Sequence, residues 1–278
     1  MDDLLIEKFY EKMKKVDLDV YGILDRNDNV LSLGTDSKVL GRIFEIKVQP
    51  ILKEIAEEND FVLETPEIQT EYPDFIMIDK SDSKKKIAID VKSAYQKSNN
   101  SQIKFTLGTF KSYMQDNTSS IAYDYTDFVK HYVIGFIYKR TDGCNAQESE
   151  IVSFKDRKKV LCPYTDVKFF VQEKYKIAGE KRGSGDTDNI GSFATKKYDD
   201  LRLGKGPFAE LGIDIYELYW RYHPKNTDTE KNYKTLLEFA NWFVGKKEED
   251  VPLLHKYDYL SVLEKIKRYI KETEKDGK

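Results

Sequence analysis

The sequence is poor in the residues that build disulfide frameworks and zinc sites. Its 278 residues include two cysteines and three histidines, and none of them lies in a C-x-x-C or H-x-x-x-H pair. Structural zinc sites need closely spaced ligands, and disulfide scaffolds need more cysteines. We therefore expect neither, and a chain of this length can bury a core that needs no cross-links.

Long apolar runs and an excess of positive charge are also missing. The first residues, MDDLLIEKFYEKMKK, carry acids where a signal peptide needs cations. The longest mostly apolar stretch, residues 132–138, is far shorter than the ~20 residues that span a bilayer. The net charge of −3, from 46 Lys and Arg against 49 Asp and Glu, excludes a globally basic nucleic-acid-binding protein but allows a locally basic cleft. We expect a cytoplasmic protein without a membrane segment.

Nucleotide-binding and serine-hydrolase motifs are absent as well. No G-x-x-x-x-G-K-[ST] loop and no G-x-S-x-G elbow occurs. With 15 Gly, 7 Pro, no repeat and no low-complexity linker, the chain is typical of one compact domain with insertions. Aromatic residues are plentiful, with 19 Tyr and 15 Phe, and they supply the burial that disordered chains lack.

Hydrophobic periodicity predicts a mixed sheet between helices. An amphipathic N-terminal helix precedes a hairpin whose strands flank a turn-rich pentapeptide. Asp36 or Ser37 then caps a long helix, which Pro50 should kink. The predicted strands are residues 20–24, 30–34, 61–64, 74–78, 86–92, 131–138 and 167–179, a loop covers 181–192, and later helices cover 214–222, 232–244 and 259–273. The fold class is α/β, or α+β, with a central mixed β-sheet flanked by helices.

Two carboxylates and a lysine follow the pattern P-D…(D/E)-x-K. Asp74 comes after a proline at the start of one predicted strand, and Asp90-Val91-Lys92 closes the next, after fifteen intervening residues. Side chains i and i+2 share a face of a strand, so Asp90 and Lys92 point the same way while their apolar neighbours point into the opposite core. If the strands pair, Asp74 lies beside Asp90.

Such a pair of carboxylates, with no histidine or cysteine nearby, forms a hard oxygen site that suits Mg²⁺. The ion would polarise a phosphodiester and lower the pKa of a bound water, while Lys92 orients that water and offsets developing negative charge. The pattern therefore predicts metal-assisted phosphodiester hydrolysis.

The triplet alone is not specific. It recurs in this sequence with its acid at Asp36, Glu45, Asp82, Asp156 and Asp166. A solvated surface pair is the competing interpretation for each. The triplet at Asp166 borders an apolar run but lacks an upstream Pro-Asp, so we interpret it as the start of a strand. Glu45 lies in the long helix, where it is either an exposed carboxylate or a third ligand for metal or water.

A loop at residues 183–189 has two interpretations. Its glycines and short polar side chains are typical of a flexible turn, but also of a loop whose backbone groups approach base edges in the major groove. Lys181 and Arg182, immediately before it, would then contact phosphates.

Several segments resemble the EcoRV family of type II restriction endonucleases, within the PD-(D/E)XK superfamily. The segments are TDSKVLGRIFE (35–45), YPDF (72–75), KKIAID (85–90), IKFTLG (103–108), YKIAGE (175–180), GSGDTDNIGS (183–192) and LGKG (203–206), and the likeness spans about residues 1–245. The resemblance implies a homodimeric, Mg²⁺-dependent endonuclease of a bacterial restriction system, with a companion DNA methyltransferase in the same cell. By analogy the double-stranded DNA site is the palindrome GATATC, cut to blunt ends.

The resemblance also assigns roles to residues. It implies that Asp74 and Asp90 are metal ligands, that Lys92 lies beside the attacking water, and that Glu45 is an auxiliary acid and metal ligand. Residues 20–33 and about 150–160 correspond to a small dimerisation subdomain, and the rest of 1–245 to the DNA-binding and catalytic part. The implied DNA-binding residues are Lys38, Gln69, Thr70, Thr106, Ser112, Lys181, Arg182, Gly183, Ser184, Gly185, Asp186, Thr187 and Asn189.

The sequence departs from the family pattern in three places. In the minor-groove loop, Thr70 and Glu71 stand where the family has more neutral or amide residues. Asp186 and Asp188 stand where the family has uncharged residues, and a carboxylate cannot donate to adenine N7, so the base sequence that is read can differ from GATATC. Residues 246–278 form a C-terminal extension whose predicted helix carries an apolar stripe, which packs on its own domain or extends the dimer. The stripe residues are Leu260, Leu263, Ile266 and Ile270.

Two alternatives remain beside the restriction enzyme. One is a dimeric DNA-binding protein without catalysis, which the complete Asp74, Asp90 and Lys92 set argues against. The other is a repair-type nuclease of the same fold that lacks sequence specificity, and its discriminator is a smear of products instead of discrete fragments.

Overall fold

The computed structural model describes residues 2–116, 120–145, 149–183, 188–225, 227–253 and 257–276. The helices are α1 (Asp2–Met13), α2 (Ser37–Glu58), α3 (Lys174–Ile177), α4 (Tyr198–Arg202), α5 (Ile213–Arg221), α6 (Leu236–Val244) and α7 (Tyr259–Asp276). The strands are β1 (Gly22–Leu24), β2 (Asn29–Ser32), β3 (Phe61–Glu64), β4 (Phe75–Asp79), β5 (Lys86–Tyr95), β6 (Thr106–Thr109), β7 (Phe128–Arg140), β8 (Ile151–Ser153), β9 (Tyr164–Glu173), β10 (Ala178–Arg182) and β11 (Asn189–Ser192).

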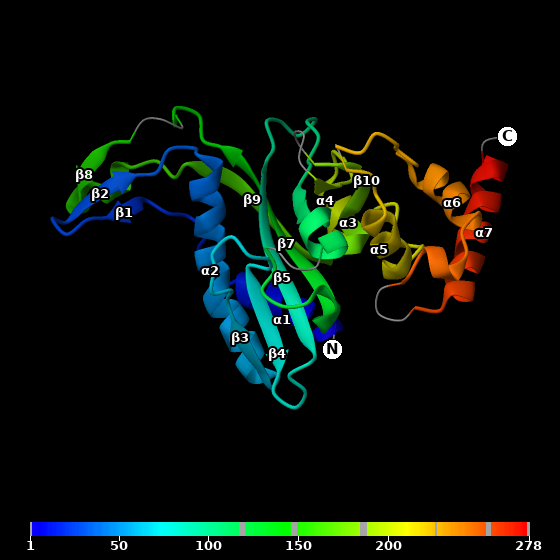
Figure 1. Ribbon diagram of the computed structural model, residues 1–278. Coiled ribbons are helices and arrows are strands. Elements are labelled where there is room, and N and C mark those ends of the chain that lie inside the picture. Colours follow the sequence, from blue (N-terminus) through cyan, green and yellow to red (C-terminus); the bar gives the residue numbers. More distant parts are fainter. Residues whose placement is uncertain are drawn as a thin grey trace.

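A five-stranded sheet in the order β3-β4-β5-β7-β9 forms the centre of the fold (Figure 1). β5 and β7 run parallel, and the other neighbours are antiparallel, so the predicted mixed sheet is confirmed. The sequence located these strands within a few residues. For residues 167–179 the sequence predicted one or two strands, and the structure has two, β9 and β10, but the short helix α3 that separates them was not predicted.

Strand β5 separates two apolar clusters. Ile87, Ile89 and Val91 face the cluster that α1 and α2 complete, while Ala88 and Ala94 face the other cluster. This is the predicted alternation, and it places the side chains of Asp90 and Lys92 on the second face.

Helix α2 covers the first face of the sheet. Asp36 is its N-cap and accepts hydrogen bonds from the amides of Lys38 and Val39, as the sequence predicted. The helix continues past Pro50, and its buried Phe44 stacks on Phe136 of β7 with ring centroids 4.4 Å apart. Burying such a side chain contributes roughly 1.5–3 kcal/mol to stability.

A small sheet lies at one end of the molecule, away from the central sheet (Figure 1). It has the order β1-β2-β8, so it joins the predicted hairpin to the segment predicted near residues 150–160. Apolar side chains remain exposed on this subdomain, with 60% exposure at Ile23 and 67% at Ile151.

A third sheet, in the order β10-β11-β6, lies beside α3 and α4. The prediction of a loop over residues 181–192 was wrong at both ends, because Lys181 and Arg182 finish β10 and Asn189–Ser192 form β11. β10 pairs with β11 and β11 pairs with β6, so tertiary pairing stabilises these polar residues as strands, which their composition alone does not indicate. Ser184, Gly185, Asp186 and Thr187 lie outside the described residues.

Helices α5, α6 and α7 lie together at the end of the molecule opposite to β1, β2 and β8 (Figure 1). The stripe on α7 packs on its own domain through buried Val262 and Ile266, with Leu263 and Ile270 half-buried. Leu260 was wrongly included, because it is 66% exposed. No helix of the described stretches is long and apolar enough to cross a membrane.

Candidate active site

The three residues of the P-D…(D/E)-x-K pattern meet where β4 begins, beside the middle of β5. Asp90 Oδ2 lies 2.7 Å from Lys92 Nζ, and Asp74 Oδ2 lies 3.5 Å from the same nitrogen. Asp74 Oδ2 also accepts a hydrogen bond of 2.7 Å from the amide of Val91. The Asp90 side chain is 4% exposed and the other two are 26% exposed, so the cluster is anchored in the core but open on one side.

Local strand geometry produces this cluster. In the antiparallel β4–β5 pair Phe75 is opposite Ile89, so the residue before Phe75 reaches the level of Asp90. The two-residue spacing on β5 then puts Asp90 and Lys92 on the same face. The short pattern therefore encodes a three-dimensional cluster, because both of its halves lie on neighbouring strands.

Burial and mutual repulsion shape the electrostatics of the pair. Burial, followed by the charge of Asp90, raises the pKa of Asp74 well above its ordinary value. Although burial alone would lower it, the charges of Asp90 and Asp74 raise the pKa of Lys92. The two nearby carboxylates repel each other when both are charged. A bound cation would reduce this repulsion, so the site favours cation binding.

The residues fit a divalent metal ion. Asp90 Oδ2 is buried, and it forms an ion pair with the Lys92 ammonium at 2.7 Å. No group of three or more His, Cys, Asp or Glu side chains forms a ready-made ligand cluster in the described stretches. Asp74 and Asp90 would thus supply two hard oxygen ligands and leave the remaining positions to water and phosphate oxygens.

Glu45 lies near this pair but does not complete it. It shares with Asp74 a cavity of about 480 Å³ that Lys38 and Gln69 also line. Its carboxylate lies 2.6 Å from Arg42 Nη1, one turn back on α2. The cavity thus brings together Glu45 from α2 and Asp74 from the residue before β4.

Part of the predicted DNA-binding set gathers at the β6–β10–β11 sheet. A Cβ at Gly183 would lie 3.2 Å from Thr106, so the two residues pack closely. The amide of Gly183 donates to the carbonyl of Asn189, and Thr109 Oγ1 donates to the carbonyl of Asp188. Both ends of the 183–189 loop are therefore held against β6.

The remaining predicted contacts differ in exposure. Arg182 is engaged within the protein, where it donates to the carbonyl of Pro224 and lies 3.6 Å from Asp188. Its side chain is 16% exposed, which is unlike a free phosphate-binding side chain. Lys38, Gln69, Thr70 and Lys181 are exposed, and Ser112 is half-buried in the short helical segment Lys111–Asp116.

Sequence reasoning missed the buried polar residues behind the carboxylates. Tyr72, Tyr113 and Lys174 all contact one another there, and each is at most 8% exposed. No spacing rule connects them, because they come from separate segments. The competing triplet at Asp166 is a surface feature as predicted, since its acid pairs with Lys139 at 2.7 Å and is 60% exposed.

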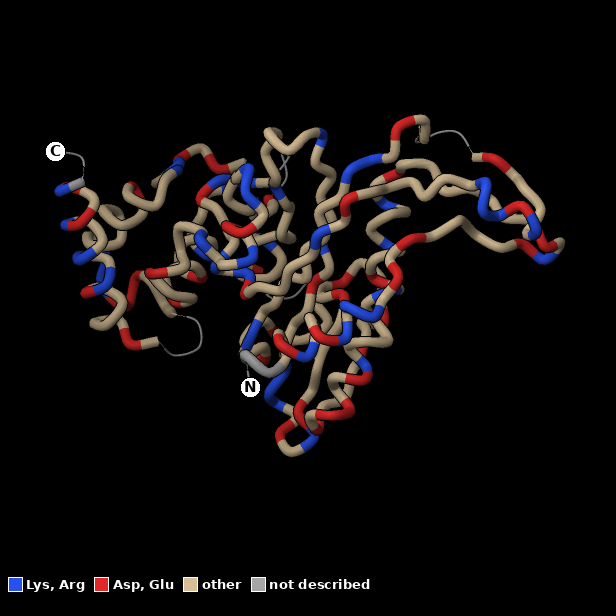
Figure 2. The backbone as a smooth tube through the Cα atoms, turned by 180° about the vertical axis from the view of Figure 1, so that it is seen from behind, with Lys and Arg blue, Asp and Glu red and all other residues tan. Residues whose placement is uncertain are grey.

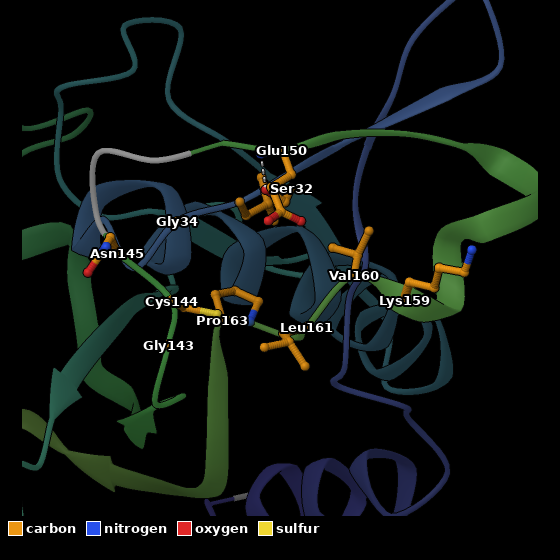
Figure 3. A pocket seen from close by; sticks show the side chains of 11 residues that line it. Ser32, Gly34, Gly143, Cys144, Asn145, Glu150, Lys159, Val160, Leu161 and Pro163 are labelled. Carbon is orange, nitrogen blue, oxygen red and sulfur yellow. Dashed lines mark hydrogen bonds between the residues drawn. The ribbon is translucent and has the colours of Figure 1, made fainter.

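A second cavity, of about 250 Å³, lies where β2 leaves the small sheet. Figure 3 shows Cys144 and Pro163 on one side of it and Ser32 with Glu150 on the other, where the Glu150 amide donates to Ser32 Oγ. None of the sequence-predicted site residues lines this cavity. It therefore belongs to the subdomain and not to the carboxylate site.

A carboxylate pair and a lysine on adjacent strands of a mixed sheet define the PD-(D/E)XK class of nucleases. Comparison with known proteins narrows the class, because the family model "Restriction endonuclease EcoRV" matches residues 14–244. The type II restriction enzyme EcoRV of Escherichia coli is 36% identical over 245 residues, which cover 87% of this chain and 98% of that enzyme.

The chain belongs to the EcoRV restriction endonuclease family. It is a site-specific deoxyribonuclease with DNA as its partner, as the resemblance in the sequence implied. Enzymes of this kind generally use a divalent metal ion. The match to the family model ends at residue 244, before α7 begins at Tyr259.

Proposed function

We propose that this protein is a homodimeric type II restriction endonuclease that uses Mg²⁺ to hydrolyse both strands of a palindromic DNA site. The observation that carries the proposal is the Asp74, Asp90 and Lys92 cluster, with one ammonium within 3.5 Å of both carboxylates. Its membership of the EcoRV family gives the substrate class.

In the proposed mechanism, Asp74 and Asp90 hold Mg²⁺, which when bound supplies Lewis-acid polarisation of the phosphodiester and a more acidic water. Lys92 orients the attacking water, and its charge offsets the negative charge that develops on the phosphate oxygens. The Val91 amide fixes the Asp74 carboxylate through its 2.7 Å hydrogen bond. Glu45 acts as an auxiliary acid from the facing helix.

We infer that the 183–189 loop reads bases in the major groove. Its ends are tied to β6, which limits the conformations in which Gly183, Asn189 and Thr106 meet DNA. Ser184, Gly185, Asp186 and Thr187 would supply further contacts. Gln69 and Thr70 would approach the minor groove, and Lys38, Ser112 and Lys181 would lie near the DNA.

The recognition sequence follows from the relative by analogy. EcoRV-like recognition would make it GATATC with a blunt cut. Asp186 and Asp188 stand where the family has uncharged residues, and a carboxylate accepts hydrogen bonds but cannot donate them, so the base sequence that is read can differ from GATATC. Mapping of the cleaved ends decides between the two.

We propose that β1, β2 and β8 mediate dimerisation. Exposed apolar side chains such as Ile23, Leu24 and Ile151 lie on this subdomain, and each is more than half exposed. A two-fold dimer matches a two-fold palindrome, and it places one active site on each strand. Because the host DNA would also contain the recognition sequence, we expect a companion methyltransferase in the same bacterial cytoplasm to protect it.

The direct test is digestion of fully sequenced plasmid and phage DNA by the purified protein with Mg²⁺, with EDTA as the control. We expect discrete ends at one palindrome that disappear with EDTA. A metal-dependent smear would instead identify a nuclease without sequence specificity. Tight binding without any cleavage would identify a non-catalytic DNA-binding dimer.

Mixed charge on the surface makes the salt dependence of binding informative. Figure 2, which shows the backbone from behind, has Lys and Arg interspersed with Asp and Glu along the described residues. We expect DNA binding by this protein to rely on the loops more than on a long-range field, and its affinity should decrease only moderately between low and physiological salt.

A further inference from the structure

A second lysine lies behind the carboxylate pair, on the side away from solvent. Lys174 begins α3 directly after β9, and the residue is 1% exposed. Its ammonium lies 4.4 Å from the ring centroid of Tyr72 and 5.2 Å from that of Tyr113. These two rings stack on each other with centroids 4.4 Å apart. Lys174 thus projects into an aromatic enclosure and not to the surface.

This ammonium has no hydrogen-bond partner within the described stretches. Burying a charge without hydrogen bonds is costly, and contacts with aromatic faces offset only part of that cost. A methionine would fill the same space without it. A charged lysine at this buried position therefore needs a nearby group of opposite charge to stabilise it.

The partner is the carboxylate site. Burial lowers the pKa of Lys174 to about 8, and among neighbouring charges Asp90 opposes this shift while Lys92 adds to it. Tyr113, which contacts Lys174, is itself influenced by Asp90, Lys92 and Asp74. Geometry agrees with this, because strand pairing puts Asp90 level with Val133 and Val133 level with Gln172, two residues before Lys174. Tyr72, whose ring Lys174 contacts, is also only two residues before Asp74. The enclosure therefore borders the site.

Two carboxylates and two ammonium groups balance each other in this arrangement. Without Lys174 the site would carry a net negative charge and attract a divalent cation more strongly. With Lys174 the cation-bound site carries a larger positive charge, which favours a phosphodiester as it gains negative charge.

We propose that Lys174 is a positioning residue whose buried charge weakens cation binding at the Asp74 and Asp90 pair and strengthens stabilisation of the transition state. This inference rests on the metal site described under the proposed function. It assigns to Lys174 two effects of opposite sign, which loss of packing alone does not produce.

The test uses the full-length protein with the substitution Lys174→Met, which keeps the volume and removes the charge. Direct titration with Mn²⁺ in the absence of DNA, followed by the paramagnetic signal of free Mn²⁺, gives the affinity. We expect Mn²⁺ to bind on the order of tenfold more tightly, because a buried positive charge that borders the site is removed. We expect the cleavage rate at saturating Mg²⁺ to decrease by a similar factor.

Two further variants serve as controls. Lys174→Arg keeps the charge and should retain wild-type Mn²⁺ affinity. Lys176→Met removes a charge from the same helix, but that lysine is paired with Glu173 at 2.5 Å and should leave both measurements unchanged. Unchanged or weaker Mn²⁺ binding by a folded Lys174→Met protein would overturn the proposal.

The substitution Asp90→Asn shows whether a negative result concerns the role of Lys174 or the metal site itself. If Asp90→Asn abolishes Mn²⁺ binding while Lys174→Met leaves it unchanged, the metal site stands and the role of Lys174 is wrong. If Asp90→Asn leaves Mn²⁺ binding at the wild-type level, the metal site itself is wrong.

Discussion

The two faces of the central sheet differ in what they bury. The face covered by α1 and α2 packs apolar and aromatic side chains such as Phe44, Leu52 and Phe136. The opposite face, which we call the active-site face, buries the charged groups Asp90, Lys174 and Glu217 among its apolar residues. Apolar packing on the first face stabilises the strands. This stabilisation offsets the cost of burying charged groups on the active-site face.

The comparison predicts that substitutions on the two faces affect different measurements. The first face should respond in free energy of unfolding. The active-site face should respond in catalysis, in pH dependence and in the stability of the C-terminal helices.

The largest expected effect is on catalysis, at the active-site face. Asp90→Asn removes one proposed ligand charge while it keeps the shape, and we expect the cleavage rate to fall by at least about a thousandfold, with folding and DNA binding retained. Quantified plasmid cleavage measures the rate. Asp166→Asn makes the same change in the exposed triplet and should cut at the wild-type rate; a loss of similar size there would contradict the assignment.

The next effect concerns stability, at the face covered by α2. Phe44→Ala removes a fully buried ring stacked on Phe136 and should lower the free energy of unfolding by about 3–5 kcal/mol. Urea unfolding measures the change. At low temperature, where the variant is still folded, cleavage per folded molecule should match wild type, and a catalytic defect there would show that the two faces are not separable.

The free energy of unfolding is expected to depend on pH through His223, which follows α5 on the active-site side of the molecule. Burial, against the hydrogen bond to Pro224, lowers the pKa of His223 to about 4. The unfolded chain, with an ordinary pKa near ~6.5, therefore binds more protons than the folded protein between these values. The stabilising contribution is complete above about pH 6.5 and is lost as the pH falls toward 4, by up to about 3 kcal/mol.

Unfolding measured from pH 7 to pH 4 tests this dependence. His223→Gln cannot titrate and should show a shallower decline over the same range. Parallel pH curves for the two proteins would assign the acid sensitivity to other groups.

The smallest effect is expected from the C-terminal extension. Lys265 of α7 lies 2.5 Å from the buried carboxylate of Asp214 on α5, so Lys265→Met leaves that acid without this partner. We expect a loss of about 1.5–3 kcal/mol in the free energy of unfolding. Lys267→Met, on the exposed side of α7, should change it little. Equal effects would show that the ion pair contributes nothing specific.

Local patterns were sufficient for most of the fold. Strand alternation identified the central strands and the sides to which Asp90 and its neighbours point, and Asp36 was correctly expected among the caps of α2. These features depend on residues close in sequence. The ends of the β10–β11 hairpin were missed, since these polar strands depend on pairing with each other and, for β11, with β6 from a distant part of the chain.

The candidate site divides in the same way. Asp74, Asp90 and Lys92 were identified from spacing, because the strands that carry them are adjacent in the chain. The pairing of Glu45 with Arg42 and the internal contacts of Arg182 were not, because several rotamers of these long side chains are compatible with the sequence.

The sequence by itself determined the central sheet, the P-D…(D/E)-x-K cluster and the family, because each depends on short-range periodicity or on residue identity. Only the tertiary structure decided which buried groups surround the cluster. Lys174 reaches Tyr72 and Tyr113 from a segment far along the chain. Such contacts arise when separate segments pack on one face of a sheet, and no local pattern records that packing.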